Sequence, residues 1–181
     1  PHVLRRRQRQ MCIRDSLGAG PVGNTVLGPD TYITVRNGSG SDVSVVLSGS
    51  VPTDTLAIDI LSSTIAVDNQ ISNPFPAGLS LDTSNLYVGA GGPLAGSSDV
   101  FNPTEQLFIY EGVPTGQNPG TSKSVIYHTG EQGPAGYYDP DDLGAGPIGS
   151  YKIPAGAAFI IRKAAGSSST VSWTPTLPYT L

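Results

Sequence analysis

Two segments of this chain repeat one another at a fixed spacing, and this limits the fold more than any other feature. Leu17–Asn24 (LGAGPVGN) matches Leu143–Ser150 (LGAGPIGS) at an offset of 126 residues (143 − 17). Without a gap, the same offset aligns positions 17–52 with 143–178, including apolar, Arg and Pro positions as well as Gly and Ser. Because a sequence repeat of this length reflects a repeated structural unit, we predict an internally duplicated domain.

Each copy shows the alternation of paired β-strands. Polar residues alternate with apolar ones on both sides of a Gly- and Ser-rich turn, as expected for strands with one buried face. We therefore predict equivalent β-hairpins over residues 31–48 and 157–174. Their predicted core-facing residues are Ile33, Val35, Val45 and Leu47 in the first copy and Phe159, Ile161, Val171 and Trp173 in the second.

The remaining sequence is strand-like and interrupted by turn residues. Leu56–Leu61, Leu107–Tyr110 and Ser124–His128 are rich in β-branched, aliphatic and aromatic residues. Leu79–Leu86 is predicted to hold a short helical turn. With 23 Gly and 16 Pro, the chain favours long loops between strands. We predict an all-β fold: an internally duplicated β-sandwich or barrel-like domain built from antiparallel hairpins, with little helix.

Residues 1–16 are interpreted as foreign to the protein. Back-translation of Arg6–Ser16 gives a string that resembles a transposase adapter used to prepare shotgun, or metagenomic, DNA libraries. The alternative is a basic arm for nucleic acid or a targeting segment. We prefer the adapter-derived origin, because a ten-residue match is very specific, and exclude the segment from the fold.

This exclusion makes the protein acidic. The chain has 10 Lys and Arg against 14 Asp and Glu; five of the basic and one of the acidic residues fall within 1–16, which leaves 5 against 13, a net charge of −8. An acidic surface does not suit nucleic acid. Cys12, the one cysteine, also lies in this segment, so disulfides and thiol chemistry are not expected. No apolar run is long enough to span a membrane.

The repeat also divides the chain. We expect one β domain over 17–181, made of a remnant of repeat 1 (17–52), a connection (53–67) and repeat 2 (68–181). In the second copy, the strands at Leu107–Tyr110 and Ser124–His128 precede the hairpin. At the offset of 126 residues, their equivalents in the first copy would fall at or before the start of the chain. We therefore expect a fragment that is prone to self-association through unpaired edge strands.

Candidate chemical sites are few. Asp139, Asp141 and Asp142 supply the oxygen ligands that calcium prefers, but their spacing matches no calcium loop. We interpret them as a solvated turn and expect no metal, cofactor or catalytic residue. His128, the single histidine after residue 16, is expected to be structural, and Arg162, like Arg36, to pack its stem over the sheet and meet an acidic group.

Four tyrosines are the candidate ligand-binding residues. Aromatic side chains on one flat face form the kind of platform on which sugar rings stack, whereas buried or rim tyrosines would explain the same residues without a ligand. These residues are Tyr110, Tyr127, Tyr137 and Tyr138.

Three segments carry a family resemblance: YITVRNGSGS (32–41) with LSGSVP (47–52), EQLFIY (105–110) with PTGQN (114–118), and IPAGAAFIIRKA (153–164) with VSWT (171–174). Together they resemble a family of secreted, β-rich, internally duplicated proteins found largely in verrucomicrobial bacteria. The resemblance covers 17–181 and departs at Tyr137, where members tend to carry Trp. It implies the C-terminal part of a longer protein, with a signal peptide upstream and an extracellular or cell-envelope location. The family has no established activity, so no catalytic residue is implied.

Two function classes follow. We expect a non-enzymatic extracellular or cell-envelope module with a structural or adhesive role. The alternative is a carbohydrate-binding module that uses exposed tyrosines. A glycosidase with paired carboxylates ranks below both, and none of the common motifs of serine hydrolases, nucleotide-binding loops or zinc proteases occurs in the sequence.

Overall fold

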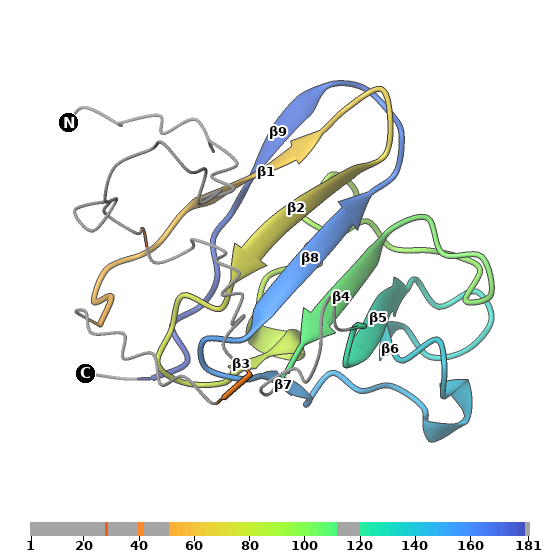
Figure 1. Cartoon of the computed structure of the whole chain (residues 1–181). Helices are drawn as coiled ribbons and strands as arrows, with labels where there is room; N and C mark the ends of the chain where they lie inside the picture. Colours follow the sequence, from red (N-terminus) through yellow and green to blue (C-terminus); the bar gives the residue numbers. More distant parts are fainter. Residues whose placement is uncertain (1–27, 29–39, 42–50, 112–119, 180–181) are drawn as a thin grey trace.

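The computed structural model describes residues 28, 40–41, 51–111 and 120–179 of the chain. This part of the chain is built from antiparallel strands and two single-turn 3₁₀ helices (Figure 1). In chain order the elements are β1 (Ile58–Ser62), β2 (Val67–Ser72), β3 (Leu79–Ser80), η1 (Leu81–Thr83), β4 (Gln106–Tyr110), β5 (Lys123–His128), β6 (Gly136–Tyr138), η2 (Leu143–Ala145), β7 (Lys152–Ile153), β8 (Ala158–Lys163) and β9 (Ser169–Trp173).

The largest sheet has five strands in the order β2-β8-β4-β5-β6, each antiparallel to its neighbours. Alternation along the strands gives this sheet two different faces. The inner face carries apolar residues such as Ile71 of β2, Leu107 of β4 and Ile161 of β8, all fully buried. The outer face carries the exposed Asp68 and Arg162 together with buried residues such as Ile126 and Ile160.

The predicted hairpin over 157–174 is wrong in its pairing. β8 pairs with β2 and β4, while β9 pairs with β1, from Ile58↔Trp173 to Ser62↔Ser169. The β1–β2 segment therefore lies between the two strands that were expected to pair (Figure 1). The turn between β8 and β9 bonds instead to the turn between β1 and β2, since the Gly166 N–H donates to the Ser63 carbonyl at 2.8 Å.

Asn69 of β2 joins the β1–β9 ribbon to the larger sheet. Its side-chain carbonyl accepts the Leu61 N–H at 2.8 Å, and its amide donates to the Leu61 carbonyl at 2.9 Å. The side chain thus supplies to β1 the pair of bonds that a backbone neighbour would supply. The two bonds satisfy the backbone N–H and carbonyl of Leu61 and so attach β1 to β2.

The core is formed by the inner face of the sheet, by β1 and β9, and by the segment from Phe75 to Leu94. Trp173 is fully buried and meets Phe159 edge to face, with ring centroids 5.6 Å apart. Its indole N–H donates to the Ser84 carbonyl at 2.7 Å, which ties the core to the turn after η1. The predicted inward orientation of Phe159, Ile161 and Trp173 is confirmed, and Val171 is half-buried.

Lys163 at the end of β8 and Glu105 form a buried ion pair. Nζ and Oε2 are 2.6 Å apart, and the side chains are only 7% and 8% exposed. The same ammonium bonds to the carbonyls of Gly92 and Pro93, and the same carboxylate accepts the Ala95 N–H at 2.6 Å. Two charges out of water are tolerated only with such additional bonds. The pair therefore fixes the long segment between η1 and β4 to the sheet.

Several predicted elements are confirmed. The three predicted strands correspond to β1, β4 and β5, and the predicted helical turn corresponds to η1. The all-β, antiparallel class is confirmed for the described residues, and β1 lies within the segment predicted to be a connection (53–67). The first hairpin (31–48) and residues 1–16 lie outside the described residues. Within the described ranges, none of the helices has the length and apolar character needed to cross a bilayer.

Lys163→Met is expected to lower the free energy of unfolding by about 3–5 kcal/mol, because it leaves the Glu105 carboxylate buried and unpaired. Lys163→Met combined with Glu105→Gln should recover part of this loss, since a neutral amide still accepts the Ala95 N–H. Urea unfolding measures both. The exposed Lys152→Met is the control and should change stability by less than about 0.5 kcal/mol. A double variant no more stable than the single one would contradict the explanation.

Trp173→Ala is expected to cost about 3–5 kcal/mol, since it opens a cavity against Phe159 and removes the donor to Ser84. Phe101→Ala, which truncates an aromatic ring that is 82% exposed, is the matched control. It should leave the thermal midpoint nearly unchanged. Equal losses in the two variants would place Trp173 outside the core.

Candidate functional site

A pocket lies on the outer face of β5 and β6. Because side chains alternate along a strand, His128 and Tyr138 project to the face opposite the core residues Tyr127 and Tyr137. His128 and Tyr138 are almost fully buried and meet edge to face, with ring centroids 5.9 Å apart. They form the floor on which the rest of the pocket is built.

The turn after β5 wraps around the His128 ring. The Gly130 N–H points to Nδ1 at 3.0 Å and the Gln132 N–H points to Nε2 at 3.3 Å. The expected structural role of His128 agrees with this arrangement, since the ring organises the turn that forms one side of the pocket.

A second side of the pocket is the segment before β4. The Ser97 N–H donates to the Tyr127 carbonyl at 2.8 Å, which attaches the segment to β5. Asp99 then accepts the Phe101 N–H through Oδ1 at 2.9 Å, a local bond typical of an Asx turn. This turn leaves Phe101 with 82% of its surface exposed at the rim of the pocket.

The third side comes from η2 and the residues that follow it. Gly146 has φ 78°, in the left-handed region that favours glycine, and it turns the chain after Leu143–Ala145. Pro147 then packs against Gly136 of β6, where an added Cβ would lie 3.2 Å from the Pro147 Cβ. This wall is the LGAGP motif of the second repeat copy.

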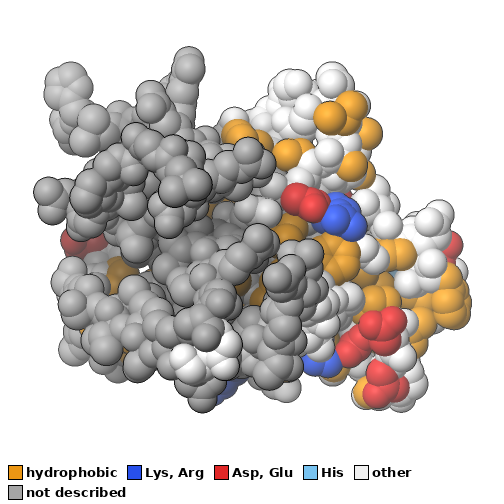
Figure 2. Space-filling model, viewed as in Figure 1, with side chains coloured by type: hydrophobic (Ala, Val, Ile, Leu, Met, Phe, Trp, Pro, Cys, Tyr) orange, Lys and Arg blue, Asp and Glu red, His pale blue; other side chains and the backbone are white. Residues whose placement is uncertain are grey.

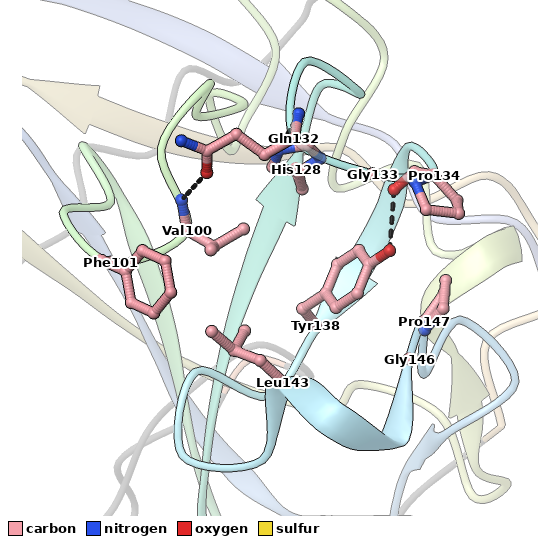
Figure 3. A pocket seen from close by; sticks show the side chains of 10 residues that line it. All are labelled: Val100, Phe101, His128, Gln132, Gly133, Pro134, Tyr138, Leu143, Gly146 and Pro147. Carbon is pink, nitrogen blue, oxygen red and sulfur yellow. Dashed lines mark hydrogen bonds between the residues drawn. The ribbon is translucent and has the colours of Figure 1, made fainter.

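The resulting pocket has a volume of about 440 Å³ (Figure 3). Figure 3 shows Phe101 and Tyr138 on opposite sides of Leu143, with His128 and Gln132 above them. The Gln132 side-chain carbonyl accepts the Val100 N–H at 3.4 Å, and the Tyr138 hydroxyl donates to the Pro134 carbonyl at 2.8 Å. The lining residues are Val100, Phe101, His128, Gln132, Gly133, Pro134, Tyr138, Leu143, Gly146 and Pro147.

The four candidate tyrosines do not form one exposed platform. Tyr127 and Tyr137 face the core, where Tyr127 stacks on Tyr87 with ring centroids 3.5 Å apart. Tyr138 lies on the outer face in the pocket floor, and Tyr110 lies on the outer face of β4. Consecutive residues of a strand point to opposite faces, so Tyr137 and Tyr138 cannot share a surface.

Burial also affects the inner tyrosines chemically. It raises the pKa of Tyr137, whose hydroxyl oxygen accepts the Tyr87 N–H at 2.9 Å, and it raises the pKa of Tyr127. Both phenols therefore stay neutral at physiological pH. Their role in the described structure is to fill the core beside β5 and β6.

The aspartate cluster is organised by protein groups. Asp139 accepts from Lys123 Nζ at 2.6 Å and from the Asp141 N–H at 3.0 Å. Burial alone would raise the pKa of Asp139, but these bonds outweigh it and hold the pKa below its usual value. Asp141 and Asp142 are exposed. Among the described residues, no three His, Cys, Asp or Glu side chains gather closely enough to hold a metal ion.

Arg162 meets an acidic group on the outer sheet face, as predicted. It makes two bonds of 2.8 Å to Asp68 and lies 4.8 Å from the centre of the Phe108 ring. The bond from Arg162 lowers the pKa of Asp68, and the same bond raises that of Arg162. Figure 2 shows hydrophobic side chains beside a contacting acidic and basic pair on this face. Arg36, its counterpart in the first repeat copy, lies outside the described residues.

Comparison of the chain with protein-family models, with curated protein sequences and with solved structures finds no match.

Two parts of the pocket were not among the predicted site residues. Phe101 lies between Asn102-Pro103 and a Ser-Asp pair, in a stretch that shows no periodicity. The LGAGP motif was recognised as a repeat but not as the wall of a pocket. The recurrence of this motif in the sequence was the available signal.

Asp139→Asn is expected to lower stability at neutral pH by about 1 kcal/mol, because it removes the charge that Lys123 meets. The folded pKa of Asp139 lies below the unfolded value, so its contribution is present above about pH 4 and is lost as the pH falls through the folded pKa. Thermal melts from neutral to strongly acidic pH should therefore converge for the two proteins. The exposed Asp141→Asn is the control, and a gap that persists in acid would contradict this assignment.

Proposed function

We propose that this chain is a non-enzymatic structural or adhesive β module that acts outside the cell or in the cell envelope. The observation that carries the proposal is the exposed Phe101 ring beside an apolar pocket. A concave, mostly apolar site is the default candidate for a binding site, and Phe101 adds an aromatic ring to its rim. The location rests on the resemblance to secreted proteins and on the acidic composition.

The segment that carries Phe101 is fixed to the sheet, as a binding surface requires. The segment with Phe101 is attached to β5 through Ser97 and to the sheet through the buried pair of Lys163 and Glu105. A surface held in place before binding loses less conformational freedom when a partner arrives. An adhesive module needs this kind of fixed contact surface.

A carbohydrate-binding module is the alternative. The tyrosines expected to form its platform are dispersed, but Phe101 is an exposed aromatic ring on which a sugar ring could stack. The two functions differ in the molecule bound, so they are separable by experiment.

The proposal is tested by sedimentation of the purified chain with bacterial envelope fragments. We expect the chain to sediment with them and Phe101→Ser to reduce the bound fraction about tenfold, as loss of an aromatic anchor does. Val88→Ser is the matched control, because Val88 is also exposed, at 65%, and lies outside the pocket.

Sedimentation that is absent, or equal in all three proteins, would count against an adhesive surface at Phe101. A glycan array then addresses the alternative. Selective binding to one class of glycan, lost in Phe101→Ser, would replace the adhesive module with a carbohydrate-binding module.

A further inference from the structure

Tyr87 and Tyr127 form a stacked pair of phenol rings at the edge of the core. The ring centroids are 3.5 Å apart and the ring planes meet at an angle of 14°. Since carbon atoms pack best at about 3.5–4.0 Å, the two rings lie almost directly over one another. Aromatic pairs usually prefer an offset or edge-to-face arrangement, because the faces of both rings are electron-rich. The surroundings of the pair therefore hold it in this geometry.

Backbone contacts on both sides position the two rings. The Tyr87 N–H donates to the Tyr137 hydroxyl at 2.9 Å, and Tyr127 of β5 is the strand partner of Tyr137 in β6. Gly96 lies against both rings, since an added Cβ would be 3.0 Å from Tyr87 Cε2 and 3.4 Å from Tyr127 Cδ1. The bond from the Ser97 N–H to the Tyr127 carbonyl holds Gly96 in this place. The two ring faces are thus kept in contact by the fold itself.

The pair is also open to reagents from solution. Tyr87 and Tyr127 are both half-buried, so a dissolved oxidant can reach them. Tyr127 has a second aromatic neighbour, Tyr137, but these rings meet edge to face, at 85° and with centroids 5.0 Å apart. Their faces do not overlap, and Tyr137 is only 4% exposed. Tyr87 is therefore the neighbour whose ring carbons face those of Tyr127.

A covalent bond at this place would join two parts of the fold. Tyr87 belongs to the long segment between η1 and β4, whereas Tyr127 belongs to β5. The chain has a single cysteine, Cys12, and cannot close an internal disulfide. A bond between the two tyrosines would close a loop across 40 positions (127 − 87). Such a link restricts the unfolded chain and so stabilises the folded one, as a disulfide does.

We propose that Tyr87 and Tyr127 are a cross-linking site, which hydrogen peroxide and a haem peroxidase convert to dityrosine. The peroxidase removes one electron and one proton from each phenol. The two phenoxyl radicals then form one carbon–carbon bond between ring positions adjacent to the carbons that carry oxygen. The hydrogens on these two positions move to the phenoxyl oxygens, which restores both aromatic rings and both hydroxyls. One molecule of peroxide is reduced to two molecules of water.

The test is treatment of the purified chain with a haem peroxidase and hydrogen peroxide at low protein concentration, where coupling between molecules is slow. We expect the monomer fraction to gain dityrosine fluorescence and to lose the mass of two hydrogen atoms. Peptide fragmentation should locate the link between Tyr87 and Tyr127. The thermal midpoint of the linked monomer should rise on the order of 10 °C, as expected for closing a loop of this length.

Matched variants identify the reacting residues. Tyr87→Phe and Tyr127→Phe keep an aromatic ring in the stack but cannot form a phenoxyl radical, so each should reduce the monomer signal to background. Tyr110→Phe is the control, because Tyr110 is also half-buried and lies on β4. It should react like the unaltered chain.

Three results would overturn the proposal: a monomer fraction without dityrosine, dityrosine confined to dimers, or an undiminished monomer signal in Tyr87→Phe. The proposal goes beyond the adhesive function and does not depend on it. Sedimentation with envelope fragments uses the untreated chain, so failure of that experiment leaves the cross-linking site intact. Absence of the link, in turn, leaves the adhesive function intact.

Discussion

The buried ion pair between Lys163 and Glu105 fixes the surface on which the candidate site depends. It joins the end of β8 to the segment between η1 and β4, which has little regular secondary structure of its own. Without hydrogen bonds to a sheet, such a segment has little to oppose its conformational entropy. The pair, with its bonds to Gly92, Pro93 and Ala95, supplies that restraint, and Ser97 extends it to β5. Phe101 is thereby held at the rim of the pocket.

The sequence predicted which residues are strands and which of their faces are buried, because both follow from local alternation. Phe159, Ile161 and Trp173 face the core as predicted, and β1, β4 and β5 lie within two residues of their predicted limits. Pairing was less predictable. A short turn after β8 suggested a hairpin, but β1 and β2 occupy the space between β8 and β9. No local signal reports that a strand far away in the sequence will provide the better partner.

The candidate site was predicted only in part. His128 was expected to be structural and Tyr138 was a candidate ligand-binding residue, yet their joint position in the pocket depends on a turn, a non-periodic segment and a 3₁₀ helix that meet in space. The four tyrosines do not form a platform. Part of the reason was already present in the sequence, since Tyr137 and Tyr138 are adjacent in one strand and therefore face opposite sides of the sheet. The sequence did not predict the ion pair between Lys163 and Glu105. The two residues are 58 positions apart, and each alone has the pattern of an ordinary surface charge.

The pairing of β1 with β9 has a consequence for how the chain matures. Ile58 and Trp173 are partners although 115 residues (173 − 58) separate them. During synthesis, β1 and β2 leave the ribosome well before β8 and β9 exist, so their ladders cannot close on a partial chain. Contacts of such long range must also overcome a large loop-closure entropy, which slows folding. The β1–β9 and β2–β8 ladders therefore form only after the last strands are made, whereas β4, β5 and β6 can pair with one another earlier.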